Sequence, residues 1–154
     1  MSARLLRRGM GWWPPFLGAG IRVRSIADDF RDAVVELKLG RLNRNYVGTH
    51  FGGSLYAMTD PFFMIMLLHN LGGEYLVWDK SGSIEYVAPG RGTVRAHFVL
   101  TEARIAEIKA QAAGGERLLP EFQAEVRHAH DDSLVALVRK TLYVRLKPRH
   151  RQPS

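Results

Sequence analysis

The stretch NYVGTHFGGSLYAMTD, residues 45–60, and the PFFMIMLLHNLGG that follows it at 61–73 decide the fold of this protein. The second stretch carries no Asp, Glu, Lys or Arg, and a single carboxylate, Asp60, stands at its border. From about Gly53 to Asn70 the residues predict a helix that is apolar nearly all round. Such a helix has to be buried on every side. Another part of the molecule must therefore cover it.

Most of the remaining chain alternates between apolar and polar residues, which is typical of half-buried strands. This alternation covers residues 20–26, 32–39, 75–79, 83–88, 93–100, 121–130 and 134–146. The segments at 75–79 and 83–88 are either one interrupted strand or two short ones. Residues 102–113 have the amphipathic pattern of a further helix, which we expect to end at Gly114 and Gly115.

These elements predict an α+β fold with about six strands and one long central helix. In this fold a curved antiparallel sheet wraps around the helix. The order of two strands, the central helix and then a run of strands is the layout of the hotdog fold. One such sheet covers only part of the helix within a subunit, so we expect a homodimer or a tetramer.

The chain has 154 residues, enough for one domain spanning 1–154. It carries a net charge of +7, and much of the excess lies near its two ends. We expect a basic N-terminal helix at about 2–13, which the prolines at 14 and 15 interrupt, and a flexible basic tail at about 148–154. A basic surface attracts polyanions such as coenzyme A. No nucleic-acid-binding motif is recognisable, so nucleic acid is not an expected partner.

Several classes of protein are excluded or disfavoured. The absence of cysteine excludes disulfides, cysteine-ligated zinc and a cysteine nucleophile. Two prolines and three glycines interrupt residues 10–20, which argues against a signal peptide. The apolar run at 61–68 is too short to span a membrane. We therefore expect a cytoplasmic protein without a membrane span.

The motif formed by Asn45, Gly48, Gly52, Gly53 and Asp60 resembles that of hotdog acyl-CoA thioesterases of the phenylacetate-pathway type. In that family an Asn and a Gly precede a Gly-Gly pair, and an acid follows on the central helix. The spacings of fifteen residues from Asn45 to Asp60 and seven from Gly53 to Asp60 fit this pattern. The wider sequence is similar to an uncharacterised bacterial branch of hotdog domains.

The resemblance implies hydrolysis of the thioester of an acyl-CoA or an acyl-carrier protein, with coenzyme A as part of the substrate and no separate cofactor. The sequence departs from the family in one place. Relatives commonly carry His directly before the Gly pair, whereas here Phe51 stands there and His50 lies one residue earlier. The part that His50 takes in the reaction therefore stays open.

Asp60 is the candidate catalytic residue. It would act as a general base that activates water, or as a nucleophile. The alternative is structural, because Asp followed by Pro is typical of a helix N-cap and first turn. A kink at Pro61 could serve both roles by aiming the carboxylate.

Gly52 and Gly53 are candidates for stabilising the oxyanion, because glycines before a helix let backbone N–H groups approach a ligand closely. Their alternative role is a tight turn into the helix. Asn45 would hold the substrate carbonyl or the attacking water. Its alternative role is that of a loop asparagine that bonds to its own backbone.

Five further residues complete the candidate substrate-binding site. Thr49 would position water, and His50 lies beside it in the same loop. Tyr56 and Phe63 would line an acyl pocket, unless they only pack in the core. Arg91 would bind the phosphates of coenzyme A, unless it is simply exposed.

Two other functions remain open. A hotdog domain that binds acyl-CoA or lipid without hydrolysis is favoured by the position of His50. A hydratase or dehydratase would need a convincing pair of a His and an acid, which the sequence lacks. His128, His130 and Asp131 lack an evident additional ligand, so we predict a turn there and no metal site.

Overall fold

The computed structural model describes residues 1–148. The predicted tail at about 148–154 lies outside the described residues, apart from Pro148. Six strands form one sheet: β1 (Ile21–Ile26), β2 (Asp32–Lys38), β3 (Tyr75–Tyr86), β4 (Thr93–Val99), β5 (Glu121–His128) and β6 (Leu134–Leu146). Their order is β1-β2-β4-β5-β6-β3, and every neighbouring pair is antiparallel. The predicted α+β architecture is confirmed.

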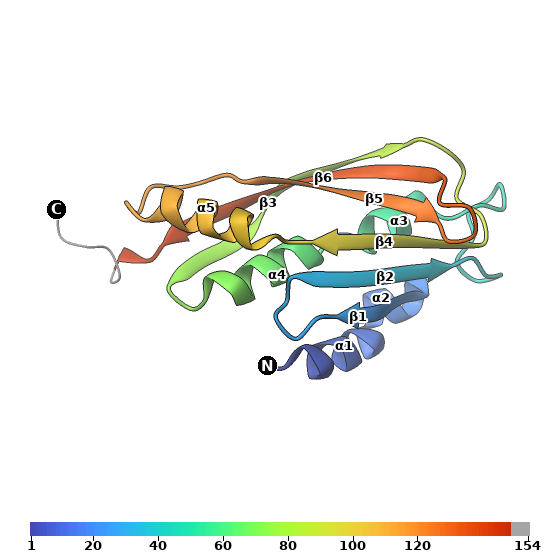
Figure 1. The fold of residues 1–154 in the computed structure, drawn as a ribbon. Helices are drawn as coiled ribbons and strands as arrows, with labels where there is room; N and C mark the ends of the chain where they lie inside the picture. Colours follow the sequence, from blue (N-terminus) through green and yellow to red (C-terminus); the bar gives the residue numbers. More distant parts are fainter. Residues whose placement is uncertain (149–154) are drawn as a thin grey trace.

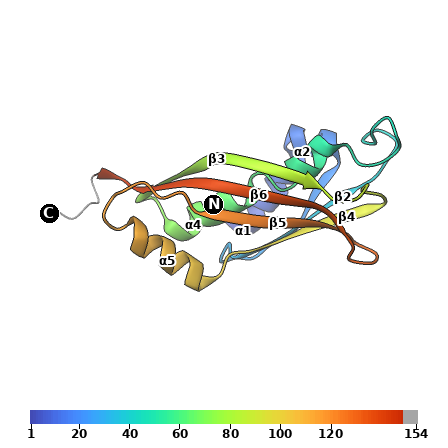
Figure 2. The same ribbon diagram turned by 90° about the horizontal axis from the view of Figure 1, so that it is seen from above.

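Five helices accompany the sheet: α1 (Ala3–Trp12), α2 (Pro14–Ala19), α3 (Gly52–Ala57), α4 (Phe62–Leu71) and α5 (Glu102–Ala112). The curved sheet wraps around α4, and α1 and α2 lie beside β1 (Figures 1 and 2). Phe16 of α2 contacts Phe62 of α4, with 6.2 Å between ring centroids. The N-terminal helices therefore extend the same apolar core. Although Pro14 and Pro15 end α1 as predicted, they also begin α2, because proline is well tolerated in a first helical turn.

The predicted central helix is present but divided into α3 and α4. Pro61 has no N–H and cannot donate to the carbonyl of Ala57. The N–H of Asp60 donates to that carbonyl instead, at 3.3 Å, and closes a turn. Helical bonding resumes when the N–H of Ile65 donates to the carbonyl of Pro61 at 3.0 Å. The break places Asp60 between two helices.

The segment at 75–86 is one strand with an irregularity in its pairing. Asp79 pairs with Leu142 of β6, whereas Gly82 pairs with Lys140, and the register shifts between Asp79 and Ser81. An extra residue of this kind reverses which side chains face inward. Asp79 on one side of the shift and Gly82 on the other therefore face the same side of the sheet.

The core lies between the sheet and α4, but one chain does not enclose α4 fully. Phe62, Met66 and Leu67 are buried, while Leu68 is 40% exposed. At the edge of the sheet, β3 pairs with β6 alone among the strands of residues 1–148. A long strand with one unpaired edge is a template for pairing with another chain. The homo-oligomer stays a prediction, and this edge is where we expect its contact.

Candidate active site

The two predicted glycines begin α3. Phe51 is the N-cap residue, and no side chain caps this helix. The backbone N–H groups of Gly52 and Gly53 have no acceptor within residues 1–148. A Cβ at Gly52 would lie 2.7 Å from Tyr86 Oη, and one at Gly53 would lie 2.5 Å from Phe51 Cε1. The absence of a side chain at Gly52 and Gly53 thus makes room for the rings of Tyr86 and Phe51. The two backbone N–H groups remain free to donate hydrogen bonds to a ligand.

A cavity of about 540 Å³ opens at this turn. It is lined by Asn45, Thr49, His50, Phe51, Gly52, Gly53, Leu55, Tyr86, Val87, Ala88, Pro89 and Gly90. The structure therefore gathers five of the predicted site residues around one hollow. The other wall comes from the end of β3 and the loop after it.

The side chain of Asn45 is fully used within its own loop. Its Nδ2 donates to Thr49 Oγ1 at 2.9 Å and to the carbonyl of His50 at 3.2 Å. Its Oδ1 accepts from the backbone N–H groups of Val47 and Thr49. An amide side chain offers two donors and two lone pairs, so none is left for a substrate. Asn45 shapes the loop, as the structural alternative expects.

His50 is buried at the same cavity, with 3% of its surface exposed. Its Nε2 lies 3.0 Å from the carbonyl of Gly92, which requires an N–H there. Burial lowers the pKa of His50, and this effect outweighs the hydrogen bond to Gly92. The ring is therefore neutral near pH 7. Its Nδ1 has no hydrogen-bond partner in the described part of the chain.

Asp60 does not cap α4. Pro61 is the N-cap residue, and no side chain bonds to the first turn. Asp60 Oδ1 instead accepts a hydrogen bond from Lys140 Nζ at 2.7 Å. Its Oδ2 has no partner within residues 1–148, and 45% of the side chain is exposed. The structure thus excludes the capping role and leaves one carboxylate oxygen available.

Lys140 is a charged side chain in the interior, with 3% of it exposed. Its ammonium group lies 2.7 Å from Asp60 and 2.9 Å from Asp79. Burial disfavours the charged lysine, but the hydrogen bonds to the two carboxylates outweigh burial and raise its pKa. The ring of Tyr56 lies 5.7 Å from Nζ and adds a cation–π contact. We call Asp60, Asp79 and Lys140 the ionic cluster.

Gly82 makes room for this cluster. It pairs with Lys140 across the sheet, and a Cβ at Gly82 would clash with the hydroxyl of Tyr56. The register shift in β3 is what brings Gly82 and Asp79 to the same inner side. Sequence reasoning missed Lys140 and Asp79. The sequence did indicate that Lys140 is buried. In the alternating pattern of residues 134–146, Lys140 falls on the same side as Val138, Leu142 and Val144, which are all buried.

The other predicted substrate-binding residues lie in different surroundings. Tyr56 lies next to the ionic cluster, with its ring over the ammonium group of Lys140. Phe63 is buried in the core, where it stacks on Phe122 with 4.8 Å between ring centroids. Arg91 is exposed in the loop between β3 and β4, and its backbone N–H donates to His128 Nε2. Neither Phe63 nor Arg91 lines the cavity at the glycines.

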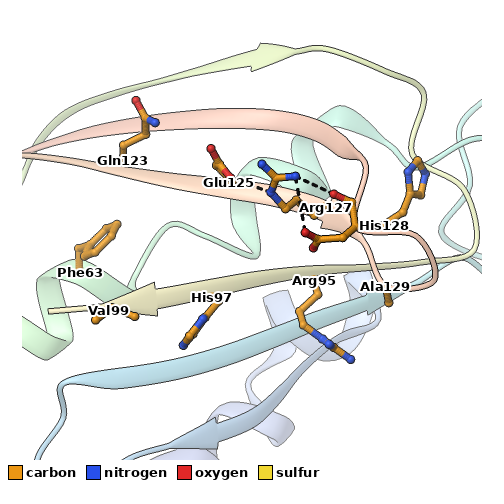
Figure 3. A pocket seen from close by; sticks show the side chains of 10 residues that line it. Phe63, Arg95, His97, Val99, Gln123, Glu125, Arg127, His128 and Ala129 are labelled. Carbon is orange, nitrogen blue, oxygen red and sulfur yellow. Dashed lines mark hydrogen bonds and ion pairs between the residues drawn. The ribbon is translucent and has the colours of Figure 1, made fainter.

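A second hollow of about 500 Å³ lies on the outer face of the sheet, where β4 and β5 diverge (Figure 3). Its charged groups already have partners. Arg127 Nε donates to Glu125 at 2.7 Å, and Arg95 pairs with the buried Glu36. Because its charges are paired within the sheet, this hollow is a weaker candidate than the glycine cavity.

The family model described as "Domain of unknown function (DUF4442)" matches residues 2–144. The chain belongs to this family. No curated protein sequence matches it.

Solved structures with 14–24% sequence identity to this DUF4442 chain share its fold. A probable thioesterase from Pseudomonas aeruginosa, described as a protein of unknown function, has 16% identity and a TM-score of 0.81, over 96% of this chain and 97% of that one. Thioesterase superfamily member 2 from Mus musculus has 17% identity and a TM-score of 0.64, over 92% and 96%. The PaaI protein of the Escherichia coli phenylacetic acid degradation operon has 15% identity and a TM-score of 0.61, over 94% and 92%. The DUF4442 chain thus has the hotdog fold that these structures share.

Two further observations concern other classes of function. Among residues 1–148, no helix is both long and apolar enough to cross a membrane. Within the same residues, no group of three or more His, Asp or Glu side chains is placed to hold a metal ion. His128 in this DUF4442 chain has both ring nitrogens engaged, by Ser133 Oγ and by the N–H of Arg91.

Proposed function

We propose that the protein is a thioesterase that hydrolyses the thioester of an acyl-CoA or an acyl-carrier protein, with Asp60 as general base or nucleophile. The observation that carries this proposal is the environment of Asp60. The carboxylate stands at the break of the central helix, is fixed through one oxygen by a buried lysine, and has its other oxygen free. A role as counterion of Lys140 accounts for Oδ1 but leaves the free, partly exposed Oδ2 without a structural function.

Lys140 is the positioning residue in this proposal. Its short bond to Oδ1 fixes the direction of the Asp60 carboxylate, and Asp79 holds the ammonium group from a second side. As a base, Asp60 takes a proton from water while the water oxygen attacks the thioester carbon. The proton then passes to the departing thiolate. As a nucleophile, the Asp60 carboxylate attacks the thioester carbon, and the C–S bond breaks to release the thiolate and leave an acyl anhydride. Water then hydrolyses the anhydride, which restores the Asp60 carboxylate, frees the acyl acid and supplies the proton that the thiolate takes up.

The N–H groups of Gly52 and Gly53 are proposed to stabilise the negative charge that develops on the carbonyl oxygen. They have no acceptor of their own within residues 1–148, and they line the cavity. The neutral His50 lines the same cavity, and its buried Nδ1 has no partner within residues 1–148. Phe51 and Tyr86 provide apolar walls for the acyl group.

Asp60 does not line the glycine cavity of its own chain. We therefore propose that the active site forms between two protomers, with Asp60 of one facing the glycine cavity of its partner. The unpaired edge of β3, the exposed Leu68 of α4 and the exposed ring of Tyr86 support this arrangement. An isologous dimer would contain two such sites.

The direct test is a hydrolysis screen over short, long and aryl acyl-CoAs, with Asp60→Asn beside the wild type. We expect turnover by the wild type and a loss in kcat on the order of 100- to 10,000-fold in Asp60→Asn, the range for removing a general base. Asp79→Asn is the matched control, because it also removes one partner of Lys140. A far smaller loss is expected there. Full activity in Asp60→Asn would contradict the proposal.

A second test addresses the shared site. Asp60→Asn and Gly53→Leu are each expected to inactivate the homodimer, the first by loss of the carboxylate and the second by filling the cavity. When the two variants are refolded together, mixed dimers contain one site with neither change. Activity should return in the mixture. A mixture that forms mixed dimers yet stays inactive would place both groups within one chain.

A binding protein without turnover is the second candidate. It is favoured by Asn45, whose hydrogen-bonding groups are all used within the loop, and by the buried, neutral His50. In that case acyl-CoA would bind at the cavity, no member of the substrate screen would be hydrolysed, and Asp60→Asn would change affinity alone.

A further inference from the structure

We propose that the N-terminal helices α1 and α2 form a docking surface for the anionic face of a phospholipid bilayer. The surface combines exposed apolar side chains with arginines, and it lies at the β1 side of the molecule (Figure 1). This role is independent of the chemistry at Asp60.

Helix α1 has two apolar faces. Ala3 and Met10 lie two turns apart and are buried toward β1. Leu5 and Trp12 also lie two turns apart, but on the opposite side, and they are 60% and 79% exposed. A helix that only covers a sheet needs the first face alone. The second face therefore calls for a partner outside the described chain.

Neighbouring side chains enlarge this exposed face. Met1, Trp13 and Leu17 are all exposed as well. An apolar hollow of about 370 Å³ lies on this face, lined by Met1, Leu5, Leu6, Gly9, Met10, Trp12 and Trp13. Tryptophan and leucine beside arginine are typical of helices that lie in the interface of a membrane, with the rings at the level of the headgroups.

A basic groove adjoins the apolar hollow. It measures about 530 Å³, and Arg7, Arg8, Arg22 and Arg24 contribute to its lining. Trp12 lines both hollows. An apolar chain beside an anionic headgroup matches this arrangement of one apolar and one basic recess.

The charge of the segment decides which partner fits. Residues 1–27 contain five arginines and no Asp or Glu. Among residues 1–148, no carboxylate forms an ion pair with Arg4, Arg7, Arg8 or Arg22. A second copy docked on the same face would place these arginines against one another. A surface of anionic lipid instead offers opposite charge.

The test is flotation of the full chain with vesicles of phosphatidylcholine, either alone or mixed with phosphatidylglycerol. We expect binding to the mixed vesicles only, and weaker binding in high salt. In a Trp78→Phe background, the tryptophan emission should shift to the blue on binding, because Trp12 and Trp13 enter the interface. Absence of flotation, or equal flotation with neutral vesicles, would overturn the proposal.

Two variants locate the surface. Arg4→Gln/Arg7→Gln/Arg8→Gln should weaken binding on the order of 100-fold, since each basic residue near an anionic surface contributes about fivefold and the three factors multiply. The control Lys38→Gln/Lys109→Gln/Arg117→Gln removes the same charge from exposed residues elsewhere and should change binding only a few-fold. An equal loss in the control would show that net charge alone is responsible.

Trp12→Ala provides an independent variant, because this exposed ring contributes little to the folded core. It should weaken vesicle binding roughly tenfold or more through the apolar contact it removes. Sedimentation of each variant without lipid completes the test. A change of oligomeric state there would assign the surface to a contact between subunits and overturn the bilayer proposal.

Discussion

The glycine cavity and the ionic cluster are held in place by different kinds of interaction. Around the cavity, Asn45 bonds to residues within five positions of itself, and the ring of Phe51 packs beside Gly53. In the ionic cluster, Lys140 and Asp60 are eighty positions apart. The wall of the cavity at residues 45–53 is thus held largely by local contacts between neutral groups, whereas the cluster is a long-range structure built by charges.

This difference has an energetic consequence. Neutral hydrogen bonds in an exposed loop contribute little each, because water replaces them when they break. A buried ammonium group has no such replacement, so its carboxylate partners are indispensable as a pair. We therefore expect changes in the ionic cluster to affect stability more than changes at the cavity.

The largest effect is expected from Asp60→Ala/Asp79→Ala. This double variant leaves the buried Lys140 ammonium without a counterion and should lower the free energy of unfolding by about 3 kcal/mol or more. Urea denaturation at pH 7 measures it. Adding Lys140→Met should restore much of the loss, because the stranded charge is then removed. A double variant as stable as the wild type would show that water reaches the ammonium.

A smaller effect is expected at the cavity from Gly52→Ala. The added Cβ meets the Tyr86 hydroxyl, but Tyr86 is 55% exposed and can swing away. We expect a cost of about 1 kcal/mol, measured by thermal or urea unfolding. In a Tyr86→Ala background the same change should cost nothing or be favourable, since alanine is the better helix former. An unchanged cost there would rule out the ring contact as the cause.

At neutral pH the smallest effect on stability is expected at His50, because its contribution changes only as the pH falls. The lowered pKa of His50 means that the unfolded chain takes up a proton before the folded chain does. Stability is therefore fully present above the unfolded pKa of about 6.5 and falls as the pH drops below it, by at most about 1.4 kcal/mol per pH unit. His50→Gln should flatten this dependence between pH 7.5 and 5.5. An identical slope in both proteins, from urea unfolding, would contradict the buried neutral state.

The sequence predicted most of the fold because the relevant signals are local. Alternation located the six strands to within a few residues, and the uncharged segment located the helix that they wrap. Pro61 carried the information about the break in that helix, since a missing N–H acts on the residues directly before it. The second short helix, α2, was missed because Pro14 and Pro15 can both end one helix and begin the next.

In the candidate site, too, the sequence predicted what local spacing determines and missed what depends on distant contacts. Local spacing along the chain was enough to bring Asn45, Thr49, His50, Gly52 and Gly53 to one cavity. It did not place Phe63 or Arg91 there, because Phe63 lies on α4 and faces the core, and Arg91 is exposed in the loop between β3 and β4. Nor could it show that the amide of Asn45 is saturated, which depends on the path of the loop.

By itself, then, the sequence determined the curved sheet, the apolar helix and the glycine turn, because periodicity and backbone chemistry act between near neighbours. Only the tertiary structure decided the environment of Asp60. A one-residue irregularity near Lys80 turns Asp79 and Gly82 toward the same face, and β6 brings Lys140 between two carboxylates. Spacing along the chain cannot specify this contact, because it depends on the register between strands far apart in the sequence.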